Sequence, residues 1–289
     1  MDREFTRREI IGAGLGAAAV ALAGAAVSTT AAAQEKSASD TVTNTEAGLS
    51  GFNKYGEELE NGLLLRTSPI AVKMIEKEED IPKGAYRPER DGGIHIAQCQ
   101  AFGMSRRQGM TVAMLKEDHW CPTALMAYGM VPKPSGGFLG ESYMSFDTGK
   151  YIGIVSAPLK NATFMPDVVV IYMNPAQLRG ALLPMNFSGS DQVKTELFLP
   201  SCGHAVVDPM KTGKYIVVLP DPGEYQRGLA TEDEVILAVP REKMQPFMAG
   251  LKPGGRMYSH REQYMDMKPD FEQPQFYKDM FKQWGLGPK

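Results

Sequence analysis

Six short apolar runs set the fold class of this chain. Each is five or six residues long, rich in strand-forming residues such as Val and Ile, and bounded by turn residues. They predict strands at residues 70–75, 111–115, 151–155, 168–172, 215–219 and 235–239. Helical patterns lie between them, at residues 52–65, 94–108, 122–129, 175–183 and 241–251. Since strands and helices alternate without strict strand–helix–strand order, we expect an α/β fold, with α+β as a variant, built on a mixed sheet flanked by helices.

The N-terminal residues have the layout of an export signal. Arg7 and Arg8 form a paired-arginine motif, and an uncharged Ala/Gly-rich run follows from Ile10 to Ala33. Paired arginines indicate the twin-arginine route, which moves folded proteins and is often used by proteins that acquire a cofactor in the cytoplasm. We expect cleavage after Ala33 and a periplasmic or otherwise exported protein. The alternative is an uncleaved anchor, because the 18 residues from Ile10 to Val27 are just long enough to span a bilayer, although Ala and Gly insert weakly.

The chain divides into four expected segments. These are a signal peptide at residues 1–33, a disordered polar tether at 34–50, a single globular domain at 51–252 and a polar, aromatic C-terminal extension at 253–289. The formal charge is −3, which gives no electrostatic reason to expect nucleic acid or an anionic membrane as a partner. No later run is apolar enough to span a bilayer, so we expect no stable membrane insertion after cleavage.

Cysteine and histidine are the residues that point to chemistry. The chain has three cysteines, and an odd number in an exported protein cannot all pair within one chain. Three of the four histidines lie close to them in sequence, giving the pairs His95 and Cys99, His119 and Cys121, and Cys202 and His204. Residues i and i+4 share a face of a helix, and residues i and i+2 share a face of a strand. Each pair can therefore present its side chains on one side.

Thiolate and imidazole are ligands of iron–sulfur clusters, zinc and copper. The spacings match no standard metal motif, and a disulfide with one free thiol, or inert buried cysteines, are the alternatives. Combined with the export route, the pattern favours an iron–sulfur cluster or a single metal ion held by Cys99, Cys121 and Cys202, with His119 as a fourth ligand. Two neighbouring features have simpler interpretations: Cys202 in a turn after a strand, and Arg106 with Arg107 on a solvated helix face.

Several short motifs, in order along the chain, carry a family resemblance. They are Thr67-x-Pro69 with Ala71-Val72-Lys73, Ala97-Gln98-Cys99-Gln100-Ala101, Thr111-Val112-Ala113, Glu117-Asp118-His119-x-Cys121-Pro122, Pro175-Ala176-Gln177, Gly223 with Arg227, and Glu234 before Ala238-x-Pro240. Together they resemble the uncharacterised "archaeal conserved region" family, domain of unknown function 169, over about residues 55–252. The resemblance implies one compact α/β-type domain, found largely in anaerobic bacteria and archaea, with no established activity. It places Cys99 and Cys121 inside family motifs.

These observations lead to one expected function and two alternatives. We expect an exported cofactor-binding protein with an electron-transfer or accessory role in a periplasmic redox system. Its partners would be the twin-arginine export machinery and a redox protein. The first alternative is a metal-free protein that binds a small molecule and uses its thiols structurally. The second is an enzyme with Cys121 as nucleophile and His119 or His204 as base. No Gly-x-Gly-x-x-Gly, phosphate-loop, nucleophile-elbow or His-Glu-x-x-His motif is present.

Overall fold

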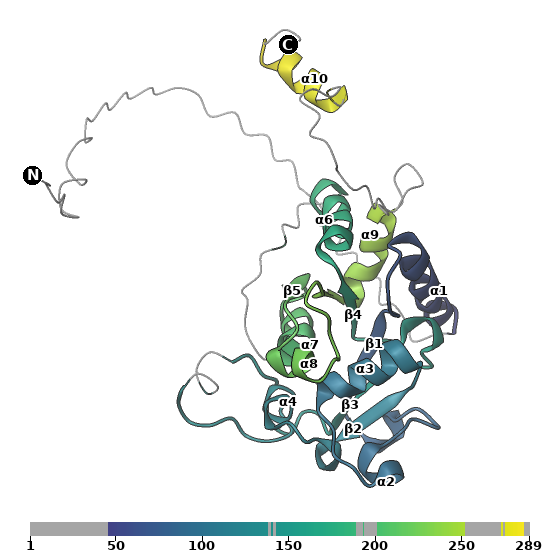
Figure 1. Cartoon of the computed structure of the whole chain (residues 1–289), viewed down its shortest axis with the longest axis vertical. Helices are drawn as coiled ribbons and strands as arrows, with labels where there is room; N and C mark the ends of the chain where they lie inside the picture. Colours follow the sequence, from purple (N-terminus) through teal and green to yellow (C-terminus); the bar gives the residue numbers. More distant parts are fainter. Residues whose placement is uncertain are drawn as a thin grey trace, which may run out of the picture. The chain divides into compact units, whose positions relative to one another are not determined.

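The six predicted strands form one sheet in the computed structural model of this chain (Figure 1). They are β1 (Ile70–Ile75), β2 (Val112–Leu115), β3 (Gly153–Pro158), β4 (Val168–Met173), β5 (Ile216–Val218) and β6 (Val235–Pro240). The structure describes residues 46–137, 140, 143–188, 193, 201–251, 273 and 275–285. The expected signal at residues 1–33, residues 34–45 of the tether and most of the C-terminal extension lie outside these residues.

The strand order across the sheet is β2-β3-β1-β4-β6-β5. All five pairings between these strands are antiparallel, whereas two isolated bridges, Tyr86–Val112 and Ile96–His119, are parallel. The predicted α/β class is confirmed, but the named strands pair only antiparallel where we expected a mixed sheet. Alternation of helices and strands in sequence does not determine strand direction, which depends on the path of each connection.

Helices cover both faces of this sheet. The helices in the described part of the chain are α1 (Glu46–Gly62), α2 (Pro88–Gly92), α3 (Gln98–Gln108), α4 (Pro122–Ala127), α6 (Pro175–Ser188), α7 (Ser201–Thr212), α8 (Pro222–Gln226), α9 (Arg241–Leu251) and α10 (Gln275–Gln283), with 3-10 turns η1 (Glu78–Asp80), η2 (Lys116–Asp118) and η3 (Leu159–Asn161). Helix α1 begins at Glu46, six residues before the predicted start at Phe52. Among the described residues, no helix has the length and apolar character needed to cross a membrane.

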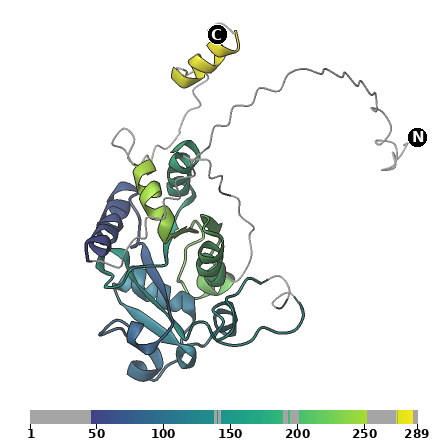
Figure 2. The ribbon, with the colours of Figure 1, turned by 180° about the vertical axis from the view of Figure 1, so that it is seen from behind.

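Two apolar layers lie between the sheet and its helices. One contains Ala71 and Ile75 of β1 together with buried residues of α1, α6 and α9. The other contains Ile70, Val72 and Met74 of the same strand together with buried residues of α3, α4 and α7. This alternation is the two-residue period of a strand. The two views of the ribbon show α1, α6 and α9 grouped together (Figures 1 and 2). All three cysteines belong to the α3, α4 and α7 side.

Candidate functional site

Each cysteine lies at the start of a helix on the same side of the sheet. Cys99 is the second residue of α3, Cys121 is the N-cap of α4, and Cys202 is the second residue of α7. Pro122 at the first position of α4 and the Gln100 side chain, which accepts from the Ala97 backbone N–H at 2.8 Å, help to begin two of these helices. Each cysteine therefore lies at the end of a helix where the partial charge of the helix dipole is positive.

The prediction that Cys202 lies in a turn after a strand is wrong, because Cys202 lies in the first turn of α7. The sequence pattern did not predict this helix. It contains Gly203, two adjacent valines and Pro209, all of which lower helix propensity. Its apolar side is nevertheless buried over three consecutive residues, Ala205 to Val207, against the sheet. Tertiary packing therefore outweighs local propensity here.

The three thiols lie within electrostatic range of one another, and none of them forms a disulfide. Burial is the largest cause that raises the pKa of the Cys99 thiol to about 12, and charges on Glu224, Asp221 and Cys121 add to it. Burial also raises the pKa of the Cys202 thiol well above its ordinary value, followed by charges on Cys99 and Cys121. Cys121 is the only half-buried one of the three. Residues far apart in sequence thus converge on one site.

His119 precedes Cys121 by two residues and has no hydrogen-bond partner on either ring nitrogen. Its residue is only 8% exposed, and its ring centroid is 6.4 Å from that of Tyr128. The Tyr128 hydroxyl donates to the Cys202 carbonyl oxygen at 3.1 Å, which links the histidine to the cysteine site. Burial lowers the pKa of His119 to about 4, with Asp118 opposing that shift. The imidazole is therefore neutral at pH 7, the form that binds metals.

Further buried polar atoms without hydrogen-bond partners belong to residues close to the cysteines. They are Gln98 Oε1 and Ser201 Oγ, which precede Cys99 and Cys202 in sequence, and the Tyr143 hydroxyl, which packs against Gly203. All three side chains are at least 99% buried. Buried polar groups in native proteins are hydrogen-bonded with few exceptions, so a group of such exceptions at one place indicates a site for a polar ligand, a cofactor or ordered water. We call Cys99, Cys121, Cys202, His119, Gln98, Tyr143 and Ser201 the cysteine site.

The other two histidines near cysteines have different surroundings. His95 is exposed, and its Nδ1 lies 2.7 Å from the Glu117 carbonyl oxygen. It does not share a helix face with Cys99, because α3 begins only at Gln98. His204 Nδ1 lies 2.7 Å from Asp208 Oδ2. His260 falls outside the described residues.

A buried carboxylate that the sequence analysis missed lies next to Cys99. Glu224 accepts a hydrogen bond from the Tyr172 hydroxyl at 2.7 Å. Burial raises the pKa of Glu224 to about 7, although the Tyr172 hydrogen bond lowers it. The available sequence signal was Asp221-Pro222-Gly223-Glu224, which forms the capping box of α8. Perturbed carboxyl groups of this kind are frequent at functional sites.

Arg106 is not on a solvated helix face as predicted. Its side chain is 1% exposed and pairs with the carboxylate of Glu234, which is 3% exposed. Arg107 next to it is exposed. The Arg106 pair joins α3, which carries Cys99, to the residue that precedes β6. Position in the helix alone could not reveal this, because the partner is more than 120 residues away.

Thiol and imidazole groups can bind metals and clusters, and these two kinds of site need different arrangements of their ligands. Within the described residues, no three His, Cys, Asp or Glu side chains are arranged to hold a single metal ion. Ligands of an iron–sulfur cluster bind different iron atoms and are therefore farther apart than ligands of one ion. Three thiols within electrostatic range and an unpartnered imidazole fit that wider arrangement better than a mononuclear one. For the enzyme alternative, neither ring nitrogen of His119 has a hydrogen-bond partner, and Cys121 Sγ lies 2.8 Å from the Thr123 hydroxyl.

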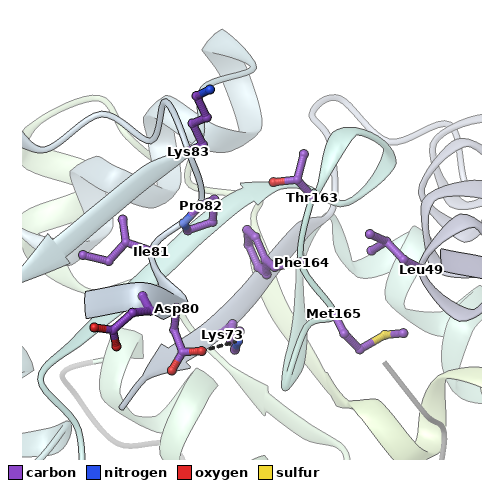
Figure 3. A pocket seen from close by; sticks show the side chains of 10 residues that line it. Leu49, Lys73, Asp80, Ile81, Pro82, Lys83, Thr163, Phe164 and Met165 are labelled. Atoms are coloured by element: carbon purple, nitrogen blue, oxygen red, sulfur yellow. Dashed lines mark ion pairs between the residues drawn. The ribbon is translucent and has the colours of Figure 1, made fainter. Parts of the chain in front are cut away.

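A separate groove of about 550 Å³ borders the other apolar layer (Figure 3). Its lining residues are Leu49, Lys73, Glu79, Asp80, Ile81, Pro82, Lys83, Thr163, Phe164 and Met165. The Phe164 ring and the Lys73–Asp80 ion pair, whose Nζ and Oδ1 atoms are 3.6 Å apart, both line this groove. It shares no residue with the cysteine site. Its volume is typical of small-molecule pockets.

Comparison with known proteins agrees with the resemblance seen in the sequence. The model of DUF169, described as "Uncharacterised ArCR", matches residues 58–250, which is 193 of the 289 residues. All three cysteines and His119 lie inside this range, and α10 lies outside it. Neither the curated proteins nor the solved structures contained a match to this chain.

Proposed function

Because the chain belongs to the uncharacterised ArCR family, DUF169, we propose its function from the cysteine site. The protein binds an iron–sulfur cluster, or failing that a thiol-ligated metal, through Cys99, Cys121 and Cys202. It is exported by the twin-arginine machinery and has an electron-transfer or accessory role in a periplasmic redox system, with a redox protein as its partner. Its folded domain would receive the cofactor before export.

One observation carries this proposal. Three reduced cysteines at three helix starts lie within electrostatic range of one another, and His119, two residues before Cys121, is buried and has no hydrogen-bond partner on either ring nitrogen. A buried imidazole without partners is costly, and a ligand bond to a cofactor removes that cost. His119 is thus the best candidate for a fourth ligand at a site with three thiolates.

The raised pKa values of Cys99 and Cys202 describe the protein without its cofactor. There both thiols are neutral, because burial disfavours the thiolate. Thiolate is the form that binds metal, so cofactor binding releases protons from these groups. We therefore expect cofactor retention to weaken as the pH falls. The helix N-termini offset part of the cost of the new negative charge.

The test compares variants of protein isolated without oxygen. We expect Cys99→Ser, Cys121→Ser and Cys202→Ser each to lose most of the bound iron, the sulfide and the visible absorption, with an unchanged far-ultraviolet circular dichroism spectrum. His119→Ala should lose cofactor or shift its spectrum. His95→Ala is the matched control and should change neither, because His95 is exposed and bonded elsewhere. Full retention of the cofactor in all three serine variants would overturn the assignment of ligands.

The groove supports a second candidate function, binding of a small molecule without metal. Its apolar wall and the Lys73–Asp80 pair would suit a compound with an apolar body and a charged end. We expect a panel of small carboxylates to raise the melting temperature of the wild type and not that of Lys73→Met. If metal-free wild-type protein folds and gains stability from such a compound, this function replaces the first.

A further inference from the structure

Helix α10 carries the densest set of exposed apolar side chains in the described part of the chain. Seven large apolar residues are strongly exposed in the described part of the chain. Three of them, Tyr277, Met280 and Trp284, lie on helix α10 or directly after it. Their exposed fractions are 46%, 38% and 60%. Phe281 contacts Trp284 edge to face, with ring centroids 5.8 Å apart. These residues follow the spacing i, i+3, i+4 and i+7, which places them on one helix face.

The opposite side of α10 is polar and basic. Lys282 falls there, and Gln275 bonds the Asp279 carboxylate at 3.0 Å. Residues 273–289 contain three lysines and one aspartate, a net charge of +2, so the rest of the chain has −3 − 2 = −5. The C-terminal 17 residues are therefore basic, although the whole chain has a net charge of −3. Gly285 ends the helix with φ of 69°, a conformation that glycine adopts without strain.

We propose that α10 binds to an anionic lipid surface. It lies in the plane of the interface with its aromatic face in the lipid and its lysines toward the headgroups. Trp and Tyr favour this depth, because each has an apolar ring and a polar group. A helix this short and apolar on one face only does not span the bilayer.

Two features favour lipid over a protein partner. The apolar face covers little more than two helical turns, which is too small for the roughly 1,200 Å² that a stable protein interface buries. The rest of the chain is acidic, so an anionic surface attracts α10 and repels the remainder. The family match ends at residue 250, so this helix is an addition to the family domain. It would hold the exported domain near a membrane after the signal is removed.

The test uses the two tryptophans of the chain. We would prepare the chain from residue 34 onward, since residues 42–289 form one compact unit by themselves, and change Trp120 to Phe. Trp284 is then the only tryptophan, so tryptophan emission reports on the end of α10 alone. With vesicles of phosphatidylglycerol and phosphatidylcholine, we expect a blue shift of its emission and co-sedimentation, both weakened by salt. Vesicles of phosphatidylcholine alone should bind about tenfold more weakly.

Two charge-reversal variants test whether vesicle binding depends on α10. Lys282→Glu should weaken binding to the anionic vesicles about tenfold. Lys54→Glu makes the same change in net charge at a lysine of α1 that is 73% exposed, and it should have little effect. Absence of both shift and co-sedimentation would overturn the proposal. A blue shift that grows with protein concentration without vesicles would overturn it too, since it would indicate a second copy of the chain as the occupant. This test needs no cofactor, so its outcome is independent of the function proposed above.

Discussion

The buried pair of Arg106 and Glu234 allows a sharp test of how α3 is held. The Arg106 guanidinium donates to both Glu234 carboxylate oxygens at 2.8 and 3.1 Å and to the Thr67 hydroxyl at 3.0 Å. It also stacks over Tyr172, 3.8 Å from the ring centroid. Changing Arg106 to Met keeps much of the side-chain volume but leaves the Glu234 carboxylate buried without its main partner. Breaking a buried pair in this way costs about 3–5 kcal/mol of the free energy of unfolding.

The matched control is Arg66→Met. Arg66 makes a bidentate pair with Asp233 at 2.6 and 2.8 Å, but the two side chains are 48% and 47% exposed. Solvent screens this pair, so its loss should cost less than about 1 kcal/mol. Urea unfolding at pH 7, followed by circular dichroism, measures both. Adding Glu234→Gln to Arg106→Met should restore part of the stability. Equal losses in the two single variants, or no recovery in the double variant, would refute the reasoning.

Three further predictions concern the surroundings of the cysteine site. In cofactor-free protein, His119→Leu should raise the free energy of unfolding in urea by about 1–2 kcal/mol at pH 7, because it removes two buried unpartnered nitrogens; a loss would mean that the ring is well satisfied. Burial raises the pKa of Glu224 from 4.5 to about 7, so the folded state binds the extra proton between these values. The contribution of Glu224 to stability should therefore fall by about 3 kcal/mol as the pH rises from 4.5 through 7, while His119, with its pKa lowered to about 4, contributes in the opposite direction. The difference in free energy of unfolding between wild type and Glu224→Gln, measured across this range, isolates the Glu224 contribution. Gly203→Ala should lower the free energy of unfolding by about 2–3 kcal/mol, since its Cβ would overlap the Tyr143 hydroxyl. Gly51→Ala in α1, with nothing within 4 Å, should raise it by about 0.5–1 kcal/mol, and a reversed order would contradict the packing.

The strands could be predicted from the sequence because their signal is local. Runs such as Val168–Met173 are apolar throughout, and the structure buries both of their faces. Helices α7 and α8 were missed for opposite reasons. The first contains residues that disfavour helix, and the second is five residues long and looks like an acidic turn. The order and direction in which the strands pair could not be predicted from the sequence, because they depend on the path of each connection between strands.

The site was only partly visible in the sequence. Cys99, Cys121 and Cys202 stood out because thiols are few, and the structure brings them within electrostatic range. Glu224 did not stand out, because nothing along the chain shows that it packs beside Cys99. Arg106 was placed in solvent because a basic pair late in a helix usually is exposed. Proximity and burial come from tertiary packing, and a single sequence does not record them.

The most direct test of the central claim is the iron and inorganic sulfide content of the whole chain isolated without oxygen. The account predicts bound iron together with inorganic sulfide, in equal molar amounts for a 2Fe–2S or 4Fe–4S cluster, and absorption in the visible range. Both should be absent when Cys99, Cys121 and Cys202 are all changed to serine. Folded wild-type protein that contains neither iron and sulfide nor any other metal would contradict the account.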